Sequence, residues 1–159
     1  MSDLQQQYSL SDISMLTNIS LRSLRNYVRM GYISGDMLDR KRVFTFQQVV
    51  ELFKDPFISE VIRKRARSVL NYEFLNSKTE GITQLVAFQI PECNDLLLHE
   101  IIDTALVAEK ELSVKVCFSF TDKGLRVFCF GNSRNVIKAT ETFRDKPHLK
   151  PILEKMREE

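Results

Sequence analysis

Apolar residues recur every three to four positions through much of the first half of the chain, a spacing that predicts amphipathic helices. The first such stretch, 9–16, has Ser9 in the N-cap position. The second, 20–31, begins at another serine and ends at Gly31, because glycine readily adopts the left-handed conformation that closes a helix. Residues 17–19 separate the two stretches, so the sequence predicts two short helices joined by a tight turn.

The pattern then changes to a weak alternation over 34–46, which predicts a small hairpin with the basic run Arg40–Arg42 near its tip. A brief helix is expected over 47–54. Asp55-Pro56 reads as a capping residue followed by a proline in the first helical turn, where a missing N–H costs nothing. We expect the helix that starts there to continue to about Leu75.

The second half has a different order of patterns, in which strands and helices alternate. The elements expected are a strand over 82–90, a helix over 94–111, strands over 113–121 and 125–131, a helix from 132 or 133 to 144, and a short helix opened by Pro151. The polar stretch 76–81 ends in glycine and is the best candidate for a domain boundary. This order predicts a small sheet with helices on one face.

Composition narrows the class of protein. The chain has 159 residues, 43% hydrophobic and 28% charged, which is ordinary for a globular protein. Residues 1–72 hold 11 Lys/Arg against 7 Asp/Glu, a net of +4, whereas residues 73–159 hold 12 against 14, a net of −2. A polyanionic partner is therefore expected to meet the N-terminal part. Without a transmembrane or signal-peptide pattern, and with three scattered cysteines, we expect a cytoplasmic protein.

The helix expected at 20–31 has three arginines and no acidic residue. Leu21, Leu24 and Val28 can bury one side of it, and the polar residues fall on the adjoining side. A solvated helix face normally mixes charges of both signs, so this face is suited to a negatively charged partner. Together with the preceding helix, the tight turn and the basic hairpin, it makes the winged helix-turn-helix pattern of a DNA-binding domain.

Residues 8–33, YSLSDISMLTNISLRSLRNYVRMGYI, resemble the N-terminal DNA-binding segment of the MerR family of transcription regulators. The match has no gap through ISLRSLRNY and MGYI, and Arg40 with Arg42–Phe44 resembles the end of the family's wing. It covers about the first 50 residues. The resemblance implies a recognition helix that reads bases and a wing that contacts the DNA backbone. After the wing the chain departs from the family, because no heptad repeat for a dimerising coiled coil follows.

We expect DNA contacts from the serines and polar residues of the second helix and from the basic hairpin, namely Ser20, Arg22, Ser23, Arg25, Asn26, Tyr27, Arg29, Lys41 and Arg42. Arg22, Asn26 and Arg29 can reach phosphates or base edges, arginine preferring guanine and asparagine preferring adenine. Ser20 and Ser23 lie near the helix N-terminus, where backbone N–H groups favour phosphate.

The resemblance implies phosphate contacts for Lys41 and Arg42 in the wing and for Tyr27. Arg25 lies nearer the apolar stripe and either contacts DNA or braces the fold through a salt bridge. The basic run 63–67 either extends the DNA footprint or is simply solvated. An amphipathic helix with a solvated basic face is the plain alternative to the whole site.

In the second half, an expected loop at 122–124 would place Cys117 opposite Cys129. Facing thiols could sense oxidants or a thiophilic metal, or they could be small buried residues that fit a sheet. The other face of the sheet is expected to pack against the helices, with Val114, Val116, Phe118, Phe120, Phe128 and Phe130.

The predicted fold class is α+β: a winged helix-turn-helix at 1–54, a linking or dimerisation helix and linker at 55–80, and a β-α-β-β-α dimerisation or sensing domain at 81–159. We expect a homodimeric, sequence-specific transcription regulator from a bacterium or phage that binds double-stranded DNA. It is expected to be no enzyme and to need no cofactor, metal or membrane, while a small molecule or protein is a candidate effector of the C-terminal domain. Two alternatives stay open, an excisionase-like architectural factor and a protein-binding inhibitor or recruiter.

Overall fold

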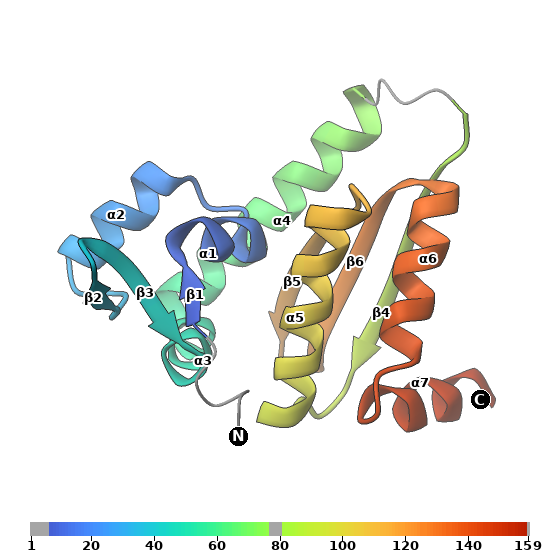
Figure 1. Ribbon diagram of the computed structural model, residues 1–159. Helices are drawn as coiled ribbons and strands as arrows, with labels where there is room; N and C mark the ends of the chain where they lie inside the picture. The colour runs from blue at the N-terminus through green and yellow to red at the C-terminus, as the bar shows by residue number, and fades with distance from the viewer. Residues whose placement is uncertain (1–6, 77–80, 159) are drawn as a thin grey trace. The chain divides into compact units, whose positions relative to one another are not determined.

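The computed structural model describes residues 7–76 and 81–158 and divides the chain into two compact units, 1–69 and 70–159 (Figure 1). Each unit combines helices with a three-stranded antiparallel sheet, so the expected α+β class is confirmed. Helix α4 (Pro56–Asn76) begins in the first unit and ends in the second. None of the helices described is both long enough and apolar enough to cross a lipid bilayer.

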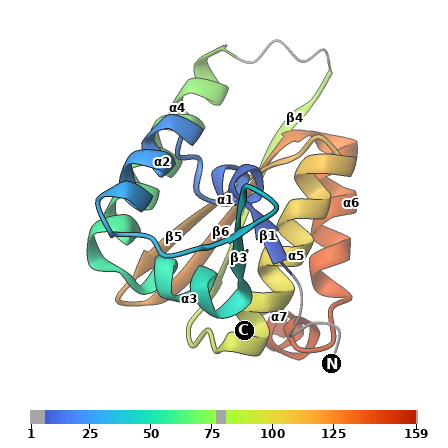
Figure 2. The same ribbon diagram turned by 60° about the vertical axis from the view of Figure 1, so that its left-hand side comes forward.

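The first unit combines three short helices with a small sheet, and Figures 1 and 2 show their arrangement. Its elements before α4 are β1 (Gln7–Ser9), α1 (Leu10–Thr17), α2 (Leu21–Arg29), β2 (Asp36–Leu38), β3 (Lys41–Thr45) and α3 (Phe46–Lys54). The sheet has the order β1-β3-β2. β1 was not predicted, because three residues are too few to show an alternation; Tyr8 at its centre pairs with Phe44, and both side chains are buried.

The expected helix ends are confirmed by their caps. The Ser9 hydroxyl accepts a hydrogen bond from the Asp12 N–H at 3.0 Å, and the Ser20 hydroxyl accepts one from the Ser23 N–H at 3.1 Å. Gly31, just after α2, has the left-handed φ of 85° that its position predicted. These signals lie within a few residues of the helix they start or end, which is why the sequence alone revealed them.

Helix α4 contributes to the core of the first unit. Its side chains Ile58, Ile62 and Ala66 are buried, and Arg65 Nε donates to the Asn18 carbonyl oxygen at 2.9 Å. The expected cap is present, since the Asp55 carboxylate accepts from the Ile58 N–H at 3.0 Å. The sequence assigned 55–80 to a separate linking segment, whereas the first unit extends through residue 69.

The second unit is a three-stranded sheet of order β4-β6-β5 with α5 and α6 side by side on one face (Figures 1 and 2). Its elements are β4 (Thr83–Ile90), α5 (Asp95–Glu111), β5 (Lys115–Thr121), β6 (Gly124–Asn132), α6 (Ser133–Arg144) and α7 (Leu149–Glu158). The predicted order of elements is confirmed. Helix α7 begins before Pro151, because the Glu100 carboxylate of α5 accepts from the N–H groups of His148 and Leu149 at 3.1 and 3.2 Å.

The predicted register of β5 and β6 was wrong by one residue. Thr121 pairs with Gly124, so the turn contains only Asp122 and Lys123. Gly124 belongs to the strand: its φ is 115°, and a Cβ there would lie 2.2 Å from the Ile90 carbonyl oxygen. This close approach comes from β4, a part of the chain that the local turn pattern could not include.

The shift separates the two cysteines, because a change of one residue turns a side chain to the other face of a sheet. Cys117 pairs with Phe128, and Cys129 pairs with Val116, so the thiols do not face each other across the ladder. Phe128 and Phe130 correspondingly lie on the face opposite Val116 and Phe118, not with them as expected. The two thiols are therefore placed as separate buried residues of the sheet.

Candidate nucleic-acid interface

Helix α2 presents a basic surface, and of the three apolar residues expected to be buried only Leu24 is, whereas Leu21 is exposed and Val28 is half-buried. Leu24 is fully buried, while Arg22, Arg25 and Arg29 are exposed and Asn26 is half-buried between them. These four polar residues line one shallow depression. The helix itself, LRSLRNYVR, contains no acidic residue, so nothing within it balances the three guanidinium groups. Such a surface attracts anions along its whole length.

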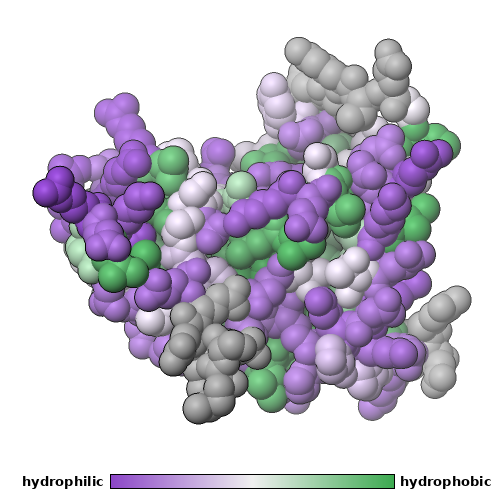
Figure 3. All heavy atoms as spheres, viewed as in Figure 1, coloured by the Kyte–Doolittle hydropathy of each residue, from purple (hydrophilic) through white to green (hydrophobic). Residues whose placement is uncertain are grey.

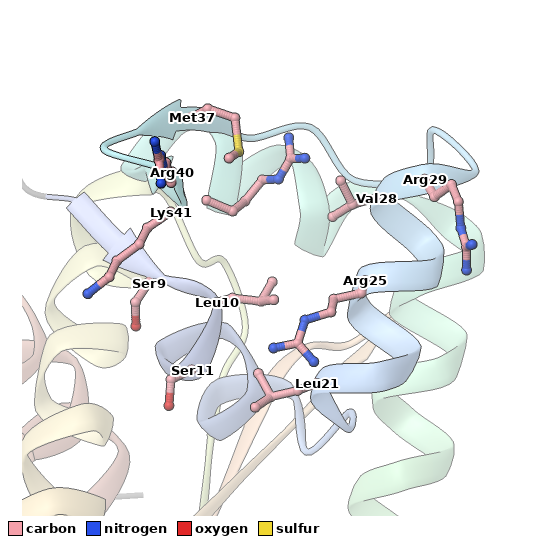
Figure 4. A pocket seen from close by; sticks show the side chains of 11 residues that line it. Ser9, Leu10, Ser11, Leu21, Arg25, Val28, Arg29, Met37, Arg40 and Lys41 are labelled. Carbon is pink, nitrogen blue, oxygen red and sulfur yellow. The ribbon is translucent and has the colours of Figure 1, made fainter.

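A groove of about 740 Å³ runs between α2 and the β2–β3 hairpin. Its floor includes the apolar side chains of Leu10, Leu21, Val28 and Met37 (Figure 4). Basic residues line it from both sides: Arg25 and Arg29 from α2, and Arg40, Lys41 and Arg42 from the hairpin. No acidic residue is among the described residues that line this groove. The surface over α2 and the hairpin is mostly hydrophilic, with an apolar patch beside it (Figure 3).

The arginines of the groove point in different directions. Figure 4 shows Arg25 extending from α2 toward Leu10, into the groove, whereas Arg29 points away from the hairpin. No ion pair involves Arg25 among residues 7–76, so the salt bridge considered from the sequence is not formed there. Arg25 is therefore available to a ligand that enters the groove.

The polar groups of α2 are connected by hydrogen bonds. The Ser20 hydroxyl, which already accepts the Ser23 N–H, lies 3.0 Å from the Ser23 hydroxyl and donates to it. Arg29 Nη2 donates to the amide oxygen Oδ1 of Asn26. These contacts use part of the hydrogen-bonding capacity of Ser20 and Asn26.

Lys41 and Arg42, the two hairpin residues expected to contact DNA, differ in how accessible their side chains are to a partner. Lys41 is exposed, and the adjacent turn residue Arg40 also lines the groove, although the sequence had not assigned it to the site. Arg42 is half-buried, and its Nη1 donates to the Gly35 carbonyl oxygen at 3.1 Å. Part of its hydrogen-bonding capacity thus holds the hairpin together. Its position at the tip was visible in the sequence, but this partner was not.

Tyr27 lies on a different side of α2, in an aromatic cluster. Its ring makes an edge contact with Phe57 of α4 at 5.5 Å between centroids, and Tyr32 stacks on Phe57 at 4.6 Å. The half-buried ring of Tyr27 therefore helps to join α2 to α4. Contact between its hydroxyl and a phosphate stays a prediction.

The basic run on α4 is partly occupied by local partners. Arg63 Nη2 lies 2.6 Å from Glu60 Oε1, and the hydrogen bond between these side chains lowers the pKa of Glu60 and raises the pKa of Arg63. Arg65 is bound to the Asn18 carbonyl oxygen. These contacts leave less of the run available for an external polyanion than the sequence suggested.

Two of the three cysteines of the second unit are held in the thiol form. Burial raises the pKa of the Cys129 thiol to about 12 and that of the Cys93 thiol to about 11. Both are protonated at neutral pH, whereas a reactive cysteine needs the thiolate. Across residues 7–76 and 81–158, no three His, Cys, Asp or Glu side chains gather closely enough to hold a metal ion.

Comparison of the chain with family models, with curated proteins and with solved structures finds no match.

Proposed function

We propose that this protein is a sequence-specific DNA-binding protein that acts as a transcription regulator. The first unit serves as a winged helix-turn-helix head, with α2 in the major groove of double-stranded DNA and the β2–β3 hairpin as a wing against the backbone. One observation carries the proposal: five basic side chains line the groove between these two elements, with no acid among the described lining residues. A sugar-phosphate strand is a polyanion of the shape and charge that such a groove suits.

Two further features support this function. The first unit holds 11 Lys/Arg against 7 Asp/Glu, a net charge of +4 that favours association with a polyanion. The segment 8–33 resembles the DNA-binding segment of MerR-type regulators in its sequence. The protein is proposed to act in the cytoplasm as a homodimer, because two heads on paired half-sites bind far more tightly than one. The second unit would supply the dimer contact or bind an effector.

The test is binding to a duplex selected by the protein from a random pool, measured by fluorescence anisotropy. Arg22→Ala should weaken binding to the selected duplex by about 1–3 kcal/mol if Arg22 contacts a base edge. Its effect on a random duplex should be smaller. Arg144→Ala, an exposed arginine of α6, is the matched control and should leave both affinities unchanged.

Failure to recover any bound duplex would contradict the proposal, and a stoichiometric protein partner in a pull-down would then favour the inhibitor or recruiter. Footprinting separates the two DNA-binding alternatives. Protection at a promoter supports a regulator, whereas tandem direct sites at a recombination junction support an excisionase-like architectural factor.

A further inference from the structure

The polar groups that α2 turns outward are almost all hydrogen-bond donors. Arg22, Arg25 and Arg29 carry guanidinium groups, which donate and cannot accept. An aspartate or glutamate would provide acceptors, but the helix contains none. The only other outward groups in the middle of this surface belong to Ser23 and Asn26, so their hydrogen bonds decide whether the surface has any acceptor to offer.

The amide oxygen of Asn26 already accepts one hydrogen bond. Arg29 donates to its Oδ1, and this contact also fixes the orientation of the amide, since only the oxygen can accept from a guanidinium. The amide nitrogen keeps both of its donors for a partner, while the oxygen keeps one lone pair beside the Arg29 guanidinium. Asparagine reads adenine by accepting from N6 and donating to N7 at the same time. With Arg29 bound to Oδ1, the adenine N6 amino group would have to share that oxygen with a guanidinium and lie beside its positive charge, which disfavours the paired contact that the residue type alone suggested.

The hydroxyl oxygens of Ser20 and Ser23 also accept hydrogen bonds within the helix. The Ser20 hydroxyl accepts the Ser23 N–H and donates to the Ser23 hydroxyl, which uses both of its roles in capping α2. The Ser23 oxygen accepts from Ser20 with one of its two lone pairs, and its own hydrogen remains available to donate outward. We call Arg22, Ser23, Arg25, Asn26 and Arg29 the donor face.

We propose that the donor face selects guanine and rejects adenine at the base pairs under α2, an inference that rests on the proposed DNA-binding function. Guanine presents two acceptors, O6 and N7, in the major groove, whereas adenine presents one acceptor beside an N6 amino donor. A donor that meets the N6 amino group leaves both groups unpaired in a dehydrated interface. Guanine is thus the base whose edge the donor face complements.

The spacing of the two outer arginines sets the expected pattern. Arg22 and Arg29 are seven residues apart, about 10 Å along a helix. At a rise of about 3.4 Å per base pair, this corresponds to about three steps of duplex. Each half-site should therefore contain two guanines about three steps apart, with Asn26 between them.

The experiment uses the full-length protein to select duplexes from a random pool, followed by sequencing. We expect guanine at two positions about three steps apart and depletion of adenine between them. Replacing either guanine by 7-deazaguanine keeps the base pair but removes N7, and should weaken binding about tenfold. Arg29→Ala should abolish one guanine preference and, by freeing Asn26 Oδ1, allow adenine at the neighbouring position. Arg144→Ala should keep the wild-type preference.

Two results would overturn the inference while leaving DNA binding intact. One is enrichment of adenine under α2 in the wild-type selection, which would mean that Asn26 releases Arg29 to read a base. The other is strong, salt-sensitive binding with no base preference and no effect of 7-deazaguanine, which would assign the donor face to phosphates alone. Recovery of no duplex is a different outcome and would contradict the proposed function itself.

Discussion

Arg40 combines a strained backbone conformation with a positive charge beside the groove. It occupies the β2–β3 turn with a φ of 67°, next to Asp39 with a φ of 50°. Tight hairpin turns require positive φ at these positions and usually meet it with asparagine or glycine. An arginine there costs stability, and its side chain lines the groove beside α2. Residues with strained backbone conformations of this kind are frequent at functional sites.

Substitution of Arg40 separates its effect on stability from its expected effect on DNA binding. Arg40→Gly should relieve the turn and raise the free energy of unfolding by about 0.5 kcal/mol, after the entropy cost of glycine is subtracted. It should also weaken binding to all duplexes, because a backbone contact does not depend on sequence. Urea unfolding and anisotropy measure the two changes. Arg40→Ala is the control, since it removes the charge and keeps the strain; wild-type affinity in both variants would contradict the role of Arg40.

At the scale of elements, Glu109 lies at the junction of α5 and β5, where burial disfavours the ionised form of its carboxyl group. Glu109 Oε1 accepts from the Val116 N–H at 3.0 Å and lies 3.6 Å from Lys115 Nζ. Burial nevertheless raises the pKa of Glu109 above its ordinary value of 4.5, outweighing these two favourable contacts. The folded state therefore binds more protons than the unfolded state between pH 4.5 and the folded pKa, and stability falls as pH rises through that window.

Glu109→Gln should raise the melting temperature at pH 7, because a neutral amide oxygen can accept from Val116 without a buried charge. The advantage should shrink as the pH falls and disappear below about 4.5, where the wild-type carboxyl is protonated in both states. Thermal unfolding monitored by circular dichroism across this range is the measurement. Glu111→Gln, at an exposed position of the same helix, should show no such convergence. A Glu109→Gln variant less stable than wild type at pH 7 would refute the assignment.

The β-hairpin of the second unit depends on close backbone packing at Gly124. A side chain there would overlap the Ile90 carbonyl oxygen in addition to the strain of a positive φ. Gly124→Ala should lower the free energy of unfolding by at least about 2 kcal/mol. Gly81→Ala is the matched control: Gly81 also has a positive φ, of 93°, but nothing lies within 4 Å of its Cβ position. Equal losses in a urea titration would show that φ alone, and not the contact with Ile90, matters.

The elements differ in how well the sequence could predict them. Helices were predictable where their signals are local, as with Ser9 and Asp12 at α1 or Asp55 at α4. The register of β6 and the start of α7 were not, because each is set by a distant partner, Ile90 for Gly124 and Glu100 for His148. Helical periodicity also gave the basic face of α2. It could not reveal that Arg29 donates to the amide oxygen of Asn26 or that Arg42 binds the Gly35 carbonyl, since side-chain partners are not encoded in spacing.

At the scale of the whole molecule, charge is divided between the units. The first unit has a net charge of +4 and the second of −2. The excess of the first unit gathers around the groove, where Arg25, Arg40 and Lys41 are exposed and have no ion pair among the described residues of that unit. A polyanion would thus be attracted to the first unit. The number of first units that contact one DNA molecule, one for a monomer or two for a homodimer, can be measured.

The salt dependence of DNA binding measures this number. For phosphate contacts, the logarithm of the association constant falls with the logarithm of salt concentration by about 0.9 per contact. With the hairpin residues Arg40, Lys41 and Arg42 as phosphate contacts, each head has three, which gives a slope of about −3 for one head and about −5 for two. Lys41→Ala should reduce the slope by about one if a single head binds and by about two if a homodimer binds through both heads. Lys123→Ala, in an exposed turn of the second unit, should leave it unchanged. A reduction of about two supports the homodimer, a reduction of about one contradicts it, and no change contradicts the phosphate contact of Lys41.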